Sequence, residues 1–207
     1  MYLWNRQFYI DTGRWADGVA ALMAATEIIN EKSDYHSDVW MPASVGPPNV
    51  LGISARLEAY APFAEERAAM LSDPDILASI AAAGPCITSV QDFLTRIVHT
   101  AGERGDVPVV CSMVNWQAHP ADLKKALVFA IELADYQHSV GGQTVVVGSS
   151  VWGQPNGITM IGNFDSLADF ESASDAIQAE GSFLDRLEAG AVGMAETIQT
   201  WVMRRAT

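Results

Sequence analysis

The sequence predicts an α+β fold in which one βαββαβ unit occurs twice in tandem. Two observations indicate the duplication. The turn 46–49 (Gly-Pro-Pro-Asn) recurs at 153–156 (Gly-Gln-Pro-Asn) with a spacing of 153 − 46 = 107 residues, and Phe63 recurs as Phe170 with the same spacing. An internal repeat is informative because it determines the architecture of the whole chain.

The earlier part of each half matches at a different spacing. Residues 16–17 (Ala-Asp) match residues 121–122, and Glu27 matches Glu132, with a spacing of 121 − 16 = 105 residues. We therefore expect a two-residue insertion between the first helix and the turn of the second copy.

Each element of the first copy has its own local signal. Phe8-Tyr9-Ile10 favour a strand, and a following apolar stripe at helical spacing predicts a helix. Pro-Asn chemistry suits the turn, after which apolar and polar residues alternate as in a half-buried strand. Pro74 is typical of the first turn of a new helix segment, so the second helix is broken there. The expected elements are strand 5–11, helix 16–31, strand 39–45, strand 50–58, broken helix 62–83 and strand 89–99.

The second copy repeats this order. Its expected elements are strand 107–116, helix 120–139, strand 143–152, strand 157–165, helix 166–189 and strand 194–204. The order βαββαβ is the ferredoxin-like pattern, in which helices cover one face of a four-stranded antiparallel sheet. The other face must also be buried, and the second copy is the expected cover. We expect ferredoxin-like repeats at 1–100 and 107–207, joined by a linker at 101–106.

Composition excludes several kinds of partner. The chain of 207 residues has 12 Lys and Arg against 25 Asp and Glu, so its formal net charge is −13, which repels nucleic acid and anionic membranes. The first residues show no basic region followed by an apolar stretch, so we expect a cytoplasmic protein without a signal peptide. Cys86 and Cys111 form no disulfide or metal motif and are expected to be reduced and buried.

One junction in the second copy resembles a known superfamily. Strand 158–165 runs into Ser166-Leu167-Ala168-Asp169-Phe170-Glu171, which is similar to the strand-to-helix junction of the dimeric α+β barrel superfamily. Its antibiotic-monooxygenase-like and NIPSNAP-like families are the most similar. In the first copy only Phe63 of this motif is kept.

The resemblance implies an intrachain pseudo-dimeric α+β barrel made by the two repeats. In the superfamily, small ligands lie between the sheet and the helices or in the barrel mouth. Its members include cofactor-independent oxygenases, haem-binding proteins and proteins without known chemistry. The resemblance therefore implies a site for a small, flat, largely apolar molecule and a cofactor-independent monooxygenase-like activity.

Polar residues at the ends of equivalent strands are the first candidates for a ligand site. Arg56 and Glu58 correspond in register to Asn163 and Asp165. If this side of the strands faces a ligand, these groups could orient it or carry a proton. The alternative is an Arg–carboxylate pair at the sheet edge or simple exposure to solvent, and the residues alone favour it.

His99 and the pair Asn115-Trp116 are the other candidates. His99 ends a strand, where it could carry a proton or bind haem axially, although a solvated His is the simpler interpretation. Trp116 could stack on a flat ligand or fill the core, and oxygenase-type members use Asn and Trp near such positions. By the spacing of 105, the equivalent pair in the first copy is Ile10-Asp11.

Neither metal nor cofactor is indicated by a motif. No two of the four histidines have a metal-ligand spacing, and no phosphate-binding glycine loop or Ser-His-Asp arrangement occurs. We expect no metal, and no cofactor; haem is within the range of the superfamily but no motif supports it.

Two function classes remain open. The first is a small-molecule binder or oxygenase-like enzyme, and the second is a non-catalytic barrel that serves oligomeric assembly or protein interaction. If a ligand site exists, we expect one asymmetric site, because Arg56 is charged whereas Asn163 is neutral. The first copy would suit a ligand with an anionic group, because Arg56 is charged. The Asn115-Trp116 strand of the second copy would suit a flat neutral ligand.

Overall fold

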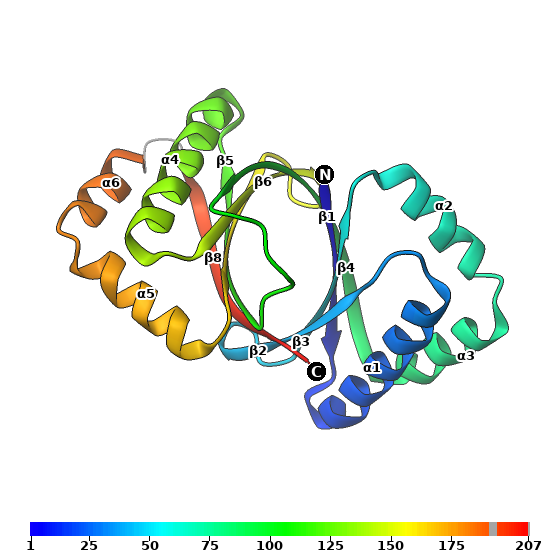
Figure 1. Cartoon of the computed structure of the whole chain (residues 1–207). Helices are drawn as coiled ribbons and strands as arrows, with labels where there is room; N and C mark the ends of the chain where they lie inside the picture. The colour runs from blue at the N-terminus through cyan, green and yellow to red at the C-terminus, as the bar shows by residue number, and fades with distance from the viewer. Residues whose placement is uncertain (191–193, 207) are drawn as a thin grey trace. The chain divides into compact units, whose positions relative to one another are not determined.

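A computed structural model describes residues 1–190 and 194–206 of the chain (Figure 1). Its elements follow the order βαββααβ twice, so the predicted βαββαβ order is confirmed with the second helix of each copy in two pieces. The predicted second repeat, 107–207, includes residues 191–193 and 207, which lie outside the described residues. Among the described helices, none is long and apolar enough to cross a membrane.

The elements of the first copy are β1 (Tyr2–Ile10), α1 (Trp15–Lys32), β2 (Asp38–Val45), β3 (Val50–Leu57), α2 (Tyr60–Met70), α3 (Pro74–Ala83) and β4 (Ile87–Ala101). Those of the second copy are β5 (Val110–Ala118), α4 (Leu123–Gly141), β6 (Thr144–Trp152), β7 (Gly157–Phe164), α5 (Leu167–Ala179), α6 (Ser182–Gly190) and β8 (Met194–Arg205). Most predicted bounds differ from these by one to three residues, as expected for frayed ends.

The chain divides into two compact units. Unit 1 comprises Met1–Pro42, Pro47–Leu94 and Arg205–Thr207, and unit 2 comprises Ala43–Gly46 and Thr95–Arg204. Within unit 2, the end of β2 is followed in hydrogen-bonded order by β8, β5, β7, β6 and the second part of β4. Within unit 1, the order is β4, β1, β3, β2. The repeat boundaries 1–100 and 107–207 stay a prediction.

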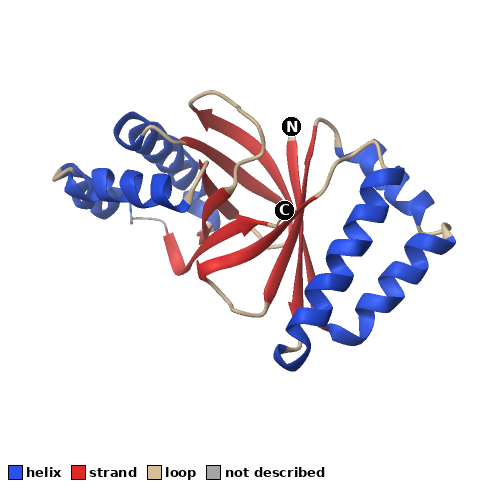
Figure 2. Ribbon diagram, turned by 60° about the horizontal axis from the view of Figure 1, so that its bottom comes forward, coloured by secondary structure: helices blue, strands red, loops and turns tan. Residues whose placement is uncertain are grey.

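In unit 1, helices α1 to α3 cover one side of the sheet, as Figure 2 shows. Helix α3 begins at Pro74, and the Asp73 side chain caps it by accepting from the backbone N–H groups of Asp75 and Ile76. Lys32 of α1 forms ion pairs with Asp73 and Asp75, which ties the two helices together. Between helices and sheet lies a core of apolar residues that includes Phe8, Ile10, Leu22, Val39, Leu51, Ile53, Ala83 and Cys86.

In unit 2, helix α4 lies against the strands through small residues. Ala126, Ala130 and Ala134 are all buried and pack into one apolar core. From the sheet this core receives every second residue of the strands, as expected where one side of a sheet is covered. These sheet residues are Trp116, Ala118, Val145, Val147, Ile158 and Met160.

The two copies correspond at a spacing of 108, not 105, in their first strand and first helix. The Ile10 N–H donates to the Asn49 carbonyl (2.9 Å), and the Ala118 N–H donates to the Asn156 carbonyl (3.0 Å), so 118 − 10 = 108. The buried positions of the two helices keep the same spacing. They are Gly18, Leu22, Ala25 and Thr26 in α1, and Ala126, Ala130, Leu133 and Ala134 in α4.

The expected spacing of 105 was therefore wrong by three residues. A shift of three residues is close to one helical turn, so in an alanine-rich helix it preserves the apolar stripe and produces false matches. With the correct spacing, Asn115-Trp116 corresponds to Gln7-Phe8 rather than to Ile10-Asp11.

Gly18 allows α1 to lie close to β1, which yields the first testable prediction. A Cβ atom on Gly18 would stand 2.6 Å from Cγ2 of Ile10 and 3.1 Å from Cβ of Cys86. We expect Gly18→Leu to lower the free energy of unfolding by roughly 1–3 kcal/mol, because overpacking moves the helix from the sheet. Ala20→Leu, at an exposed position of the same helix, is the control for urea denaturation. Equal stability of the two variants would contradict the close packing.

Candidate functional site

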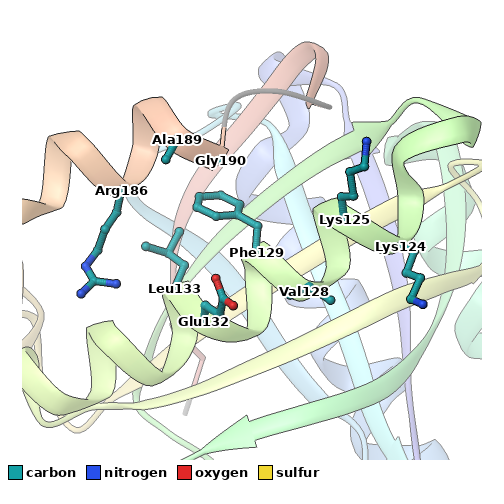
Figure 3. Close-up of a pocket in the computed structure, with 9 residues that line it drawn as sticks. All are labelled: Lys124, Lys125, Val128, Phe129, Glu132, Leu133, Arg186, Ala189 and Gly190. Atoms are coloured by element: carbon teal, nitrogen blue, oxygen red, sulfur yellow. The ribbon is translucent and has the colours of Figure 1, made fainter.

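An open groove runs between helices α4 and α6 of unit 2 (Figure 3). Its volume is about 840 Å³, which is within the usual range for small-molecule sites. Both helices contribute residues, and Figure 3 shows side chains of α4 and α6 on either side of the space. The lining residues are Lys124, Lys125, Val128, Phe129, Glu132 and Leu133 from α4, and Arg186, Ala189 and Gly190 from α6.

The groove exists because the last helix packs differently in the two copies. In unit 1, helix α3 buries Ile76 and Ala83, whereas no residue of α6 is buried. Ala21 and Ala25 of α1 correspond, at the spacing of 108, to the larger residues Phe129 and Leu133 of α4. A Cβ atom on Gly190 would run into the ring of Phe129. The larger side chains of α4 thus limit how closely α6 approaches, and the groove is the result.

Two buried polar atoms lie in the apolar core below this groove. Leu133 lines the groove and belongs to the same core cluster as Trp116 and Tyr136. Among the described residues, neither Nε1 of Trp116 nor the hydroxyl oxygen of Tyr136 has a hydrogen-bond partner, although both atoms are buried. An unpartnered buried polar group costs about 1–3 kcal/mol, so both atoms would gain from a ligand acceptor.

The sheet next to Trp116 is uncovered. Ile198 of β8 lies directly opposite Trp116 in the strand register, so the two side chains share the helix-facing side of the sheet. Trp116 is 2% exposed whereas Ile198 is 57% exposed. Apolar surface between the sheet and the helices of unit 2 is therefore open to solvent at β8.

Aromatic and charged groups surround the same space. Tyr136 stacks on Phe183 of α6, with ring centres 6.4 Å apart and an interplanar angle of 9°. The Arg186 guanidinium lies 4.5 Å from the centre of the Tyr136 ring, a cation–π distance. Glu132 adds one carboxylate to the groove, one helical turn before Tyr136. The arrangement offers flat apolar walls, hydrogen-bond donors, a cation and a base.

Of the residues predicted from sequence, Trp116 lies on the helix side of the unit 2 sheet and Asn115 on the opposite side. The Asn115 side-chain oxygen accepts from the Thr159 hydroxyl at 2.7 Å. Asn163 shares the side of Asn115 and lies opposite Cys111, four residues along the strand. Burial raises the pKa of the Cys111 thiol to about 12, so this thiol is protonated at neutral pH. These residues do not line the groove.

Arg56 and Glu58 belong to unit 1. Both are exposed; Arg56 lies near the end of β3, opposite Leu3 of β1, and Glu58 follows the strand. Arg56 matches Asn163 at the spacing of 107, and the two residues lie on equivalent sides of their sheets. Their role in ligand binding stays a prediction.

The four histidines all lie away from the groove. His99 Nε2 lies 2.7 Å from Asp135 Oδ1, and His138 Nδ1 bonds to the Gln143 carbonyl at 2.9 Å. His119 accepts from the Ala121 N–H, and His36 lies 3.7 Å from Asp38. A haem in the groove would find no axial histidine among its lining residues, so the groove does not fit haem.

The described part of the chain contains no group of three or more His, Cys, Asp or Glu side chains that could hold a metal ion.

Sequence reasoning missed most of the groove residues. Phe129 and Glu132 lie within a helix whose first match was made at the wrong spacing, and Tyr136, in the core beside the groove, was not among the predicted site residues. Phe183 and Arg186 are spaced i, i+3 on α6 and so share a helix face, which is the one local signal for an aromatic and a cation acting together.

Comparisons with known proteins establish the fold. No family model and no curated protein matches the sequence. A provisionally assigned monooxygenase from Fusobacterium nucleatum has a TM-score of 0.71 at 8% identity, covering 100% of this chain and 92% of that one. An anthrone oxidase-like protein has a TM-score of 0.68 at 13% identity, with 100% and 91% covered. A mutant chlorite dismutase from Candidatus Nitrospira defluvii has a TM-score of 0.54 at 11% identity, with 98% and 90% covered.

The resemblance stated from the sequence is confirmed at the level of fold, because provisionally assigned monooxygenases and an anthrone oxidase-like protein share this fold. The predicted fold class, two tandem ferredoxin-like repeats in a pseudo-dimeric α+β barrel, is therefore confirmed by matches over the whole chain. At such identities the likeness establishes the fold and not the activity.

The lack of a partner for the Tyr136 hydroxyl is testable by mutation. We expect Tyr136→Phe to leave the free energy of unfolding unchanged or to raise it by up to about 1 kcal/mol, because a buried unpartnered hydroxyl is removed. Thr159→Val, which removes the bond to Asn115, is expected to lower it by about 1 kcal/mol and serves as the comparison. Thermal and urea denaturation measure both. A loss above about 1 kcal/mol in Tyr136→Phe would show that the hydroxyl is bonded within the protein.

Proposed function

We propose that this protein binds a small, flat, largely apolar molecule in the groove between α4 and α6. The observation that carries the proposal is the pair of buried donors, Trp116 Nε1 and the Tyr136 hydroxyl, in the core below an open apolar groove. A fold gains nothing from leaving two donors of one core unpaired, whereas a ligand with an acceptor oxygen pairs them.

The groove lining, together with the core residues beside it, defines the chemistry of this ligand. Phe129, Leu133 and Phe183 supply apolar and aromatic surface for a planar body. Trp116 and Tyr136 supply neutral N–H and O–H donors, which suit a carbonyl or phenol oxygen. Arg186 adds a positive charge that stabilises such an oxygen if it becomes an enolate. A polycyclic aromatic ketone or phenol has all three properties.

Binding to the groove is expected to depend on its volume. Anthraquinone, a flat tricyclic diketone, is the probe, and isothermal titration calorimetry is the measurement. We expect one site per chain and an affinity at least about tenfold lower in Gly190→Leu, whose side chain enters the space next to Phe129. Leu184→Ala is the matched control, because Leu184 is an exposed α6 residue that does not line the groove.

Equal affinity of the wild type and Gly190→Leu for anthraquinone would contradict the proposal.

The alternative function is oligomeric assembly with a second copy of the chain. It is supported by Trp152, which is 71% exposed beside the exposed Val151 at the end of β6. That alternative replaces the proposal if anthraquinone does not bind and light scattering shows an oligomer that Trp152→Ser converts to monomer.

The second candidate activity is oxidation of the bound molecule by O₂ without a cofactor. Glu132 favours it, because a carboxylate in the groove can take the proton from a carbon next to a carbonyl group. The resulting enolate reacts directly with O₂; for anthrone, one O₂ is consumed, and anthraquinone and one water are formed. Provisionally assigned monooxygenases and an anthrone oxidase-like protein share the fold, which supports this candidate.

Oxygen uptake with anthrone tests this candidate. We expect the wild type to accelerate O₂ consumption above the buffer rate, and Glu132→Gln to lose at least about 10²-fold in rate while still binding anthraquinone. An unchanged rate in Glu132→Gln would show that Glu132 is not the base.

A further inference from the structure

Unit 1 contains a partly buried arginine, Arg67, that forms no ion pair with a carboxylate among the described residues. Arg67 of α2 points into an aromatic cluster on the helix side of the sheet. Its guanidinium carbon lies 5.0 Å from the centre of the Phe63 ring and 5.4 Å from that of Trp4. Tyr35 packs edge-on against Phe63 at 5.4 Å, so the two rings next to the cation, Phe63 and Trp4, belong to a larger aromatic cluster.

The hydrogen bonds of Arg67 are incomplete. A guanidinium has five N–H donors. Nη2 donates to the buried Ser37 hydroxyl oxygen at 2.8 Å, but Nε is buried and has no partner among the described residues. Burial lowers the pKa of Arg67, and the positive charge of Arg6 lowers it further against the opposing effect of Glu66. The guanidinium nevertheless stays charged.

The neighbouring carboxylates are already engaged elsewhere. Asp92 binds Arg6 through two bonds of 2.7 and 2.8 Å. Glu66 accepts from the Ser33 hydroxyl and from the Asp34 N–H. Arg6 also lies 5.4 Å from the Trp4 ring, so Trp4 is next to two guanidinium groups. Arg67 itself is in no ion pair within the described structure, and its buried Nε is an unused donor.

The second copy shows that the fold does not need this arginine. At the spacing of 107, Phe63 corresponds to Phe170 and Arg67 corresponds to Ser174, whose hydroxyl bonds only to its own helix at Phe170. Trp4 of β1 lies opposite Ala55 of β3. The equivalent pair in unit 2 is Ser112 of β5 and Gly162 of β7, so Ser112 occupies the position of Trp4. The same helix and strand therefore fold in unit 2 with serines in both places.

We propose that Arg67, Ser37, Trp4 and Phe63 form a second binding site, which takes a planar aromatic carboxylate. One carboxylate oxygen accepts from Arg67 Nε, and the other accepts from the Ser37 hydroxyl, which already receives Nη2 and still has its own proton to donate. The ring of the ligand packs among the partly exposed Trp4, Tyr35 and Tyr60. The aromatic surroundings favour an arene carboxylate over an inorganic anion.

This site goes beyond the proposed function, because it lies in unit 1 and shares no residue with the α4–α6 groove. It departs from the expected single site. From the sequence we expected the first copy to suit an anionic group at Arg56; the present proposal places such a group at Arg67 instead.

Titration with 2-naphthoate by isothermal calorimetry tests the second site. We expect one site in the wild type, an affinity at least about tenfold lower in Arg67→Met, and a smaller loss in Ser37→Ala. Arg14→Met, at an exposed arginine that bonds to the Pro85 carbonyl, is the control and should bind like the wild type. Gly190→Leu should also bind naphthoate normally, which separates this site from the groove.

Unchanged naphthoate affinity in Arg67→Met would overturn the proposal. Inorganic phosphate binding as tightly as naphthoate would also overturn it, because the site would then be a general anion site. Circular dichroism checks that Arg67→Met folds. If that variant does not fold, Ser37→Ala decides, and its unchanged affinity would equally contradict the site.

Discussion

The close approach of the first helix of each copy to its sheet is the constraint on which the rest of the structure depends. Gly18 in α1 and Ala126 in α4 occupy the same position, where the space above the strand admits almost no side chain. The first helix is held in place by this contact. Its residues one and two turns beyond Gly18 or Ala126 then determine how closely the last helix of the same copy can pack against it. Small residues in α1 let α3 bury Ile76 and Ala83, whereas Phe129 and Leu133 in α4 leave α6 without a buried residue.

The two copies therefore share a fold and differ in chemistry. In unit 2 the space between α4 and α6 is a groove above a core that holds two unpaired donors, Trp116 Nε1 and the Tyr136 hydroxyl. In unit 1, α3 buries Ile76 and Ala83, and an aromatic cluster beneath α2 holds the incompletely bonded Arg67. The side chains at these places can differ between the copies, because the fold requires neither set.

The sequence allowed the fold to be predicted because strand and helix periodicities are local, and because the Gly46 and Gly153 turns fix the match between copies. Both glycines have a positive φ, 129° and 107°, which explains why they recur. The first-helix match failed because alanine-rich helices are self-similar at one turn. The groove could not be predicted, since it arises from the volume of Phe129 against Gly190, two residues 61 positions apart (190 − 129). Trp116 lies on the helix side of the sheet, whereas its neighbour Asn115 faces the other side and bonds to Thr159, so the two predicted residues do not share one site, and the role of each in ligand binding stays a prediction.

The most direct test of the central claim is a crystal structure of the protein soaked with anthraquinone. We expect a planar ligand between α4 and α6, with a carbonyl oxygen about 2.7–3.2 Å from Trp116 Nε1 or the Tyr136 hydroxyl. A ligand bound elsewhere, or a groove in which α6 has closed onto Phe129 while both donors bond to the protein itself, would contradict it.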